Sequence, residues 1–145
     1  MLKGLDSLLT PELLMHLSAM GHGEWVAVVD ANFTADFLGK GKALVRLPGH
    51  SLERVSKAVL SVFPLAEDVA CPAAYMQVCH SPEGHQTAAQ ASVVALLSQE
   101  GLPASRVEAV ERFAFYEKIK GASVIVQSGE ATAYGNAMFC KGVIL

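Results

Sequence analysis

The feature of this sequence that most restricts its fold is Trp25–Val29, a run of consecutive apolar residues that stops at Asp30. A strand with one face in water alternates apolar and polar side chains, whereas a strand covered on both faces is apolar throughout. Residues 122–127 are rich in β-branched side chains and are predicted to form a second strand of this kind. Both segments predict a sheet with helices on both faces, as in α/β proteins.

Segments with helical spacing alternate with strand-like segments along the chain. Thr10 is placed to cap a helix that Pro11 begins, and Gly21 is predicted to end that helix in a left-handed conformation. The alternation predicts one α/β domain, residues 1–145, with a mostly parallel central sheet. The remaining pattern predicts helices over residues 51–63, 87–100 and 113–120, strands over residues 43–47, 73–79, 106–110 and 136–144, and loops over residues 31–42 and 128–134.

Composition and charge exclude several classes of function. The chain is 52% hydrophobic and only 17% charged, against about 25% charged in a typical domain. The excess of apolar side chains predicts contacts between subunits. The last strand, from Ala137 to Leu145, is a candidate for these contacts. A net charge of −3 without a basic cluster argues against nucleic-acid binding. The absence of a signal peptide and of any apolar run of about 18 residues argues against secretion and membrane insertion.

Motifs for cofactors and metals are absent. The chain has no glycine-rich dinucleotide or phosphate loop, no nucleophile elbow and no zinc-protease motif. His80 and His85 flank Glu83 at a loose spacing, which we interpret as a solvated turn rather than a metal site. Three cysteines without a CxxC pair predict free thiols in a reducing, cytoplasmic setting. We therefore expect neither a cofactor nor a metal.

Two candidate chemical groups lie at the ends of the strand 25–29. His22 lies between Gly21 and Gly23, where it is either part of a helix cap or a proton-transferring group close to a ligand. Asp30 follows the strand and either caps the next loop or belongs to a site, since ligands gather at the carboxyl ends of parallel strands.

The C-terminal third carries further candidates. Arg112, predicted at the end of a strand, offers planar donors that suit hydroxyl or carboxylate groups. Tyr134 and Asn136 bracket a glycine, which indicates either a simple turn or a pair of hydrogen-bonding groups presented to a polyol. Phe113 and Phe115 are more simply explained as the buried face of a short helix, and Tyr116 is a candidate lining residue.

Taken together, several of these segments resemble the RbsD/FucU family of sugar mutarotases, and the later blocks resemble its fucose branch. The middle of the chain, residues 51–105, matches in pattern only. The matching blocks, in the order of the family, are residues 9–14 (LTPELL), 20–23 (MGHG), 29–33 (VDANF), 112–117 (RFAFYE), 134–136 (YGN) and 141–143 (KGV).

The resemblance implies a three-layer α/β/α sandwich and a cytoplasmic, cofactor-free isomerase that interconverts the α and β anomers of a free sugar, with L-fucose or a related sugar as substrate. It implies that His22 transfers a proton, helped by Asp30, and that Asp30, Arg112, Tyr134 and Asn136 bind the sugar. It also implies a homo-oligomer, a ring or a decamer, with each site near a subunit boundary.

One position departs from the family pattern, and two other functions stay open. Thr34 stands where the family commonly has proline after Asn-Phe, so the shape of that loop and the sugar preference are open. The main alternative function is a non-catalytic monosaccharide-binding protein. The third is a structural oligomer that binds no sugar.

Overall fold

The computed structural model describes residues 1–145 and contains a single six-stranded sheet, in the order β2-β5-β1-β6-β3-β4. Strands β2, β5 and β1 are parallel to one another, as are β3 and β4, while β6 runs antiparallel between β1 and β3. The predicted mostly parallel sheet is therefore confirmed. The strands are β1 (Trp25–Val29), β2 (Ala43–Leu47), β3 (Ala73–Met76), β4 (Val107–Val110), β5 (Ala122–Ser128) and β6 (Ala137–Cys140).

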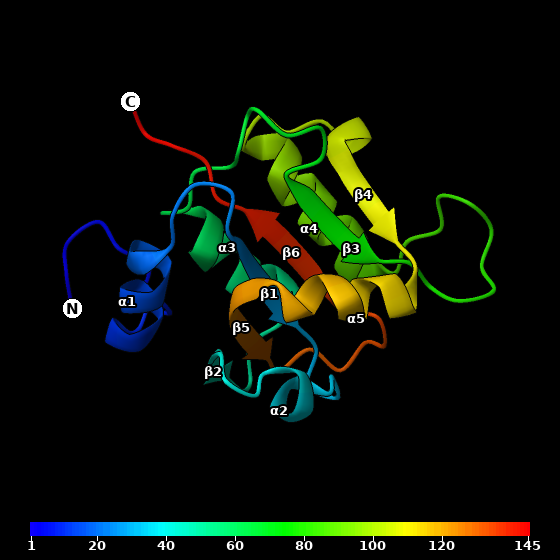
Figure 1. Ribbon diagram of the computed structural model, residues 1–145, viewed down its shortest axis with the longest axis horizontal. Helices are drawn as coiled ribbons and strands as arrows, with labels where there is room; N and C mark the ends of the chain where they lie inside the picture. The colour runs from blue at the N-terminus through cyan, green and yellow to red at the C-terminus, as the bar shows by residue number, and fades with distance from the viewer.

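Helices cover both faces of this sheet, which confirms the three-layer α/β/α sandwich. In Figure 1, α5 lies in front of the sheet, and α3 and α4 lie behind it. Within β1, Val26 and Val28 pack against residues of α1, α3 and α4, whereas Ala27 and Val29 pack against α2 and α5. The run 25–29 is apolar throughout because both of its faces are buried. The helices are α1 (Pro11–Ala19), α2 (Ala35–Leu38), α3 (Leu52–Leu60), α4 (Ala88–Gln99) and α5 (Arg112–Lys120), with a short 3-10 helix, η1 (Ala104–Arg106), before β4.

Two local predictions about the first helix and the following loop need correction. The hydroxyl of Thr10 accepts the N–H of Leu13, as predicted for a cap. However, α1 ends at Ala19, Met20 after it is extended, and Gly21 is not left-handed. The left-handed residue is Gly23, with φ of +82°. The predicted loop over residues 31–42 contains the short helix α2.

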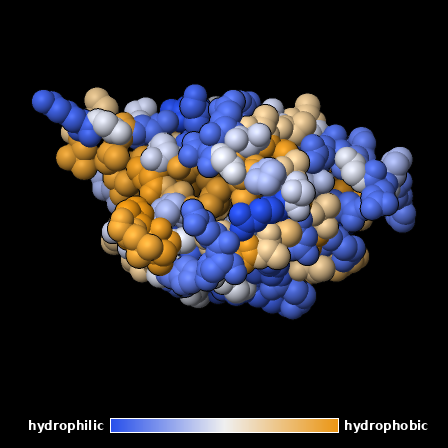
Figure 2. All heavy atoms as spheres, turned by 90° about the horizontal axis from the view of Figure 1, so that it is seen from above, coloured by the Kyte–Doolittle hydropathy of each residue, from blue (hydrophilic) through white to orange (hydrophobic).

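The last strand is also shorter than predicted, and only the end of the range predicted for subunit contacts, 137–145, is exposed. β6 ends at Cys140 and lies in the centre of the sheet, where all its residues are buried. Only the tail beyond it is exposed, at Val143, Ile144 and Leu145. Figure 2 shows the molecule from above the view of Figure 1, and apolar side chains gather on the left of the face that it presents. This is the end of the molecule where both termini lie in Figure 1.

Candidate functional site

A cavity of about 500 Å³ opens at the carboxyl ends of β1 and β3. Because β6 is antiparallel to both strands, its first residues reach the same edge of the sheet. Four predicted site residues, Asp30, Arg112, Tyr134 and Asn136, lie together in this cavity. Its lining residues are Asp30, Asn32, Phe33, Thr34, Met76, Arg112, Tyr116, Ala133, Tyr134 and Asn136.

Asp30 and Asn136 form the buried floor of the cavity. Their side chains and backbone pair twice: Asn136 Nδ2 donates to Asp30 Oδ2 at 3.0 Å, and the Asp30 N–H donates to Asn136 Oδ1 at 2.9 Å. The N–H of Asn32 donates to the other carboxylate oxygen at 2.9 Å. Burial raises the pKa of Asp30, although the hydrogen bonds from Asn136 and Asn32 oppose this. Each carboxylate oxygen keeps a lone pair with which it can accept a hydrogen bond from a ligand hydroxyl.

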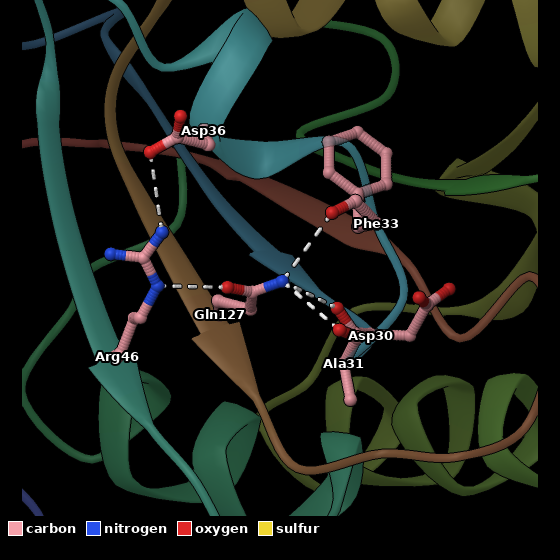
Figure 3. A network of polar contacts seen from close by, with 6 residues as sticks. All are labelled: Asp30, Ala31, Phe33, Asp36, Arg46 and Gln127. Carbon is pink, nitrogen blue, oxygen red and sulfur yellow. Dashed lines mark hydrogen bonds and ion pairs between the residues drawn. The ribbon is translucent and has the colours of Figure 1, made fainter.

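The loop that follows Asp30 is held from the neighbouring strands (Figure 3). Gln127 of β5 donates its side-chain amide to the carbonyls of Asp30, Ala31 and Phe33, at 3.2–3.4 Å. Arg46 of β2 donates to the Gln127 carbonyl oxygen at 3.1 Å, which fixes the orientation of the amide. This network determines where the loop presents Asn32, Phe33 and Thr34 to the cavity.

A strained turn presents Tyr134 to the cavity. Its φ of +63° is unusual for a residue other than glycine. The amide of Gln90, which is fully buried, donates to the Tyr134 carbonyl at 2.8 Å and to the Met76 carbonyl at 2.6 Å. A Cβ at Gly135 would lie 2.7 Å from Glu130 Cγ, so only glycine fits between Tyr134 and Asn136. The turn at residues 134–136 therefore positions two of the polar residues that line the cavity.

Arg112 is the first residue of α5 rather than the end of a strand, because β4 stops at Val110 and Glu111 caps the helix. Its Nε donates to the Tyr116 hydroxyl at 2.9 Å, and this contact raises the pKa of Arg112. The guanidinium lies 5.6 Å from the Tyr116 ring centre, within cation–π range. Its terminal nitrogens make no hydrogen bond within the chain and remain available to a ligand.

His22 lies at the opposite end of β1 from Asp30. The strand between them covers about 13 Å on its own, and no hydrogen bond joins the two residues. His22 Nε2 instead lies 2.9 Å from Oδ1 of Asp68, and both side chains are about half exposed, at 45% and 59%. The hydrogen bond with His22 lowers the pKa of Asp68. In one protomer, the structure therefore separates the predicted proton-transferring residue from the four other site residues.

Sequence reasoning missed the supporting residues Asp68, Met76, Gln90 and Gln127. Gln90 offered one signal, since Thr87 three residues earlier predicts a capping box, which the structure contains. The other three carried none, because their partners lie more than 40 residues away in sequence.

The structure contains neither a metal-binding cluster nor a membrane-spanning helix. No three His, Cys, Asp or Glu side chains come together as a metal site, and no helix has the length and hydrophobicity to span a bilayer. His80 and His85 are exposed, and all three cysteines are free thiols.

Comparison with known proteins defines the family. The model of the RbsD / FucU transport protein family matches residues 3–144. The chain belongs to this family. It is 40% identical to the fucose mutarotase of Danio rerio and 37% identical to that of Homo sapiens, in each case over 99% of this chain and 94% of the relative.

Solved structures agree with this assignment. The crystal structure of the fucose mutarotase from Streptococcus pneumoniae, in complex with L-fucose, superposes with a TM-score of 0.88 at 27% identity. The match covers 99% of this chain and 100% of the other. The RbsD/FucU resemblance of the fucose type is thus confirmed over the full length.

Proposed function

We propose that this protein is an isomerase, a mutarotase that interconverts the α and β anomers of L-fucose. The observation that carries the proposal is the buried Asp30–Asn136 pair at the floor of a cavity of about 500 Å³, a volume typical of small-ligand sites. Full-length similarity to fucose mutarotases supports the choice of sugar. The three free cysteines support a reducing compartment, and we place the protein in the cytoplasm.

The reaction opens the sugar ring and closes it on the other face of the anomeric carbon. Opening requires a proton delivered to the ring oxygen and a proton removed from the anomeric hydroxyl, and closure reverses both transfers. The bond between the anomeric carbon and the ring oxygen breaks and re-forms, and only protons are transferred between sugar and protein, so we expect no cofactor. Asp30 and Asn136 bind sugar hydroxyls, Arg112 and Tyr134 bind others from the rim, and Tyr116 lines the cavity beside Arg112.

His22 is the residue we assign to proton transfer. An imidazole can both donate and accept a proton. With Nε2 bonded to Asp68, Nδ1 of His22 is free. Asp68 then orients the imidazole, and Asp30 binds the sugar rather than the histidine.

Because His22 and Asp30 lie at opposite ends of β1, we infer that the complete site forms between two copies of the chain. A homo-oligomer in which the His22–Asp68 end of one protomer faces the Asp30 cavity of its neighbour brings both halves to one sugar. Phe113, which the sequence predicted on the buried face of its helix, is instead exposed and lies against Tyr116 at the cavity. It is available for such contacts, as is the exposed Phe37 of α2. We expect a ring or a decamer, and dissociated protomers to be inactive.

The second candidate is a non-catalytic monosaccharide-binding protein. The specific observation in its favour is that one protomer holds the whole polar cavity without His22. Such a protein binds sugar but does not accelerate the exchange of its anomers.

Saturation-transfer NMR distinguishes the two candidates. We expect the protein to accelerate anomer exchange of L-fucose more than that of D-ribose or D-galactose. General acid–base catalysis contributes about 10²–10⁴-fold, so His22→Ala should lose at least about 100-fold. Calorimetric binding of L-fucose together with equal, slow exchange in wild type and His22→Ala would favour the binding protein. No sugar affinity at all would leave only a structural oligomer.

A further inference from the structure

His22 sits in a segment that does not fix its own position. Both of its neighbours are glycines, and Gly23 has φ of +82°. Glycine leaves the backbone more conformational freedom than any other residue. A proton-transferring imidazole must nevertheless stay close to its productive geometry, since an error of about 1 Å costs up to about 100-fold in rate. Contacts from other segments must therefore hold the loop.

Lys141, which follows β6, makes several of these contacts. Its ammonium donates to the carbonyls of Leu17 and Met20, at 2.7 and 2.5 Å. These carbonyls belong to the end of α1, where they have no partner within the helix and the helix dipole favours a cation. Met20 lies two residues before His22, so the lysine fixes the chain at the entry to the loop.

The backbone of Lys141 fixes the exit of the same loop. Its carbonyl accepts the N–H of Gly23 at 2.8 Å, and its N–H donates to the Glu24 carbonyl at 2.8 Å. The Glu24 carboxylate accepts the N–H of Gly21 and, at 2.8 Å, the hydroxyl of Ser123. The residues on both sides of His22 are thus tied to β5 and to the segment after β6.

Arg106 holds the loop of Asp68 in a similar way. Its guanidinium donates to three carbonyls of this loop, those of Glu67, Val69 and Ala70, at 3.2, 2.7 and 3.1 Å. Two of these carbonyls flank Asp68 directly. A planar guanidinium suits this task because its donors point in fixed directions.

The short segment 140–142 joins the two loops. The backbones of Cys140 and Gly142 bond to the segment that contains Asp68, through Pro64, Ala66 and Pro72. The backbone of Lys141, between them, bonds to the loop that contains His22. We propose that Lys141 and Arg106 are positioning residues that set the geometry of the His22–Asp68 pair. The inference rests on the proposed function, in which His22 transfers the proton.

The test measures kcat and KM for L-fucose anomer exchange by saturation-transfer NMR. We expect Lys141→Met and Arg106→Met to lower kcat by about 10- to 100-fold with little change in KM, because the sugar-binding cavity lies at the other end of the sheet. Lys141→Arg, which keeps a cation able to reach both carbonyls, should recover most of the loss.

Matched controls separate positioning from general destabilisation. Lys57→Met removes an exposed lysine whose ammonium makes no hydrogen bond. Arg54→Met removes a guanidinium that is paired with Asp6 at 2.7 and 2.8 Å and bonds to neither loop. We expect both to keep kcat. An equal loss in Arg54→Met, a kcat of Lys141→Met within about 2-fold of wild type, or no recovery in Lys141→Arg would overturn the inference.

A milder variant decides the matter if Lys141→Met does not fold. Ser123→Ala removes only the hydroxyl that holds Glu24, and we expect a kcat several-fold lower at unchanged KM; an unchanged kcat would overturn the inference. His22→Ala, measured alongside, separates the two proposals. If wild type does not accelerate exchange, the proposed function fails, and if His22→Ala retains the accelerated rate of wild type, the role of His22 in proton transfer fails. An inactive His22→Ala beside fully active loop variants refutes the positioning role alone.

Discussion

The two ends of β1 carry polar groups in opposite surroundings. At the carboxyl end, Asp30 and Asn136 are only 6% and 2% exposed and bond to each other. At the amino end, His22 and Asp68 are about half exposed and are held by loops. Sugar binding gains from a dry, rigid floor, whereas the exposed histidine needs a second surface to exclude water from it. The contrast is the one that the proposed function requires, with one end complete in the protomer and the other completed by a second copy.

The largest expected effect is a rescue of activity by mixing two inactive variants. His22→Ala and Asp30→Asn should each be nearly inactive alone. If every site takes His22 from one copy and Asp30 from another, co-expressed and randomly mixed oligomers regain about a quarter of the wild-type exchange rate, since this fraction of sites is intact. Saturation-transfer NMR on the purified mixed oligomer measures the gain.

A mixture of His22→Ala with wild type serves as the control and should show about half of the wild-type rate. If the mixture of the two variants is no more active than their average, the site does not combine residues of two copies, and the comparison of the two ends loses its functional meaning.

The second prediction concerns stability at the two ends. Asn136→Leu leaves the Asp30 N–H and carboxylate without their buried partner and should lower the free energy of unfolding by about 1–3 kcal/mol. It should also weaken L-fucose binding. His22→Ala removes a half-exposed side chain and should leave the free energy of unfolding almost unchanged. Urea denaturation and calorimetry measure both, and equal destabilisation by the two substitutions would contradict the contrast in burial.

The sequence predicted the fold well because its signals were local. The apolar run 25–29 and the helix caps depend on neighbouring residues, and they gave the layers and the parallel pairs. The placement of β6 was not local: an antiparallel strand in the centre of a parallel sheet brings Asn136 to Asp30, a separation of 106 residues.

The site was predicted only in part, because some of its contacts join segments that are distant in sequence. Family blocks selected Asp30, Arg112, Tyr134 and Asn136, which the structure brings together. The order of His22, the strand 25–29 and Asp30 along the chain already put the histidine and the aspartate at opposite ends of that strand. Nothing in the sequence indicated that Asp68 is the partner of His22, because that contact depends on how two loops meet in three dimensions.

A third prediction uses the opposite pKa shifts of the two aspartates. Burial raises the pKa of Asp30, so its charge costs stability at neutral pH, and this cost disappears as the pH falls through the raised value. The hydrogen bond with His22 lowers the pKa of Asp68, so its stabilisation is present above the usual value of about 3.9 and is lost at lower pH.

Acidification from about pH 6 to about pH 3.5 should therefore change two stability differences in opposite directions. The free energy of unfolding of wild type relative to Asp30→Asn should rise, and that relative to Asp68→Asn should fall. Urea denaturation at a series of pH values measures both differences. A change of the same sign for both would mean that the surroundings of the two carboxylates do not differ as the structure indicates.

The smallest expected effect tests whether the loop at the Asp30 end is as rigid as its floor. Thr34 replaces the proline common in the family, yet its φ of −73° lies within the range of proline, and its N–H makes no backbone hydrogen bond. Gln127 already holds the preceding residues from β5. Thr34→Pro should then raise the free energy of unfolding by about 0.4–1 kcal/mol, by restricting the unfolded chain, and should leave the KM for L-fucose unchanged. A loss of stability in urea denaturation would show that the native loop needs a backbone that proline cannot adopt, and a changed KM would make residue 34 a determinant of sugar preference.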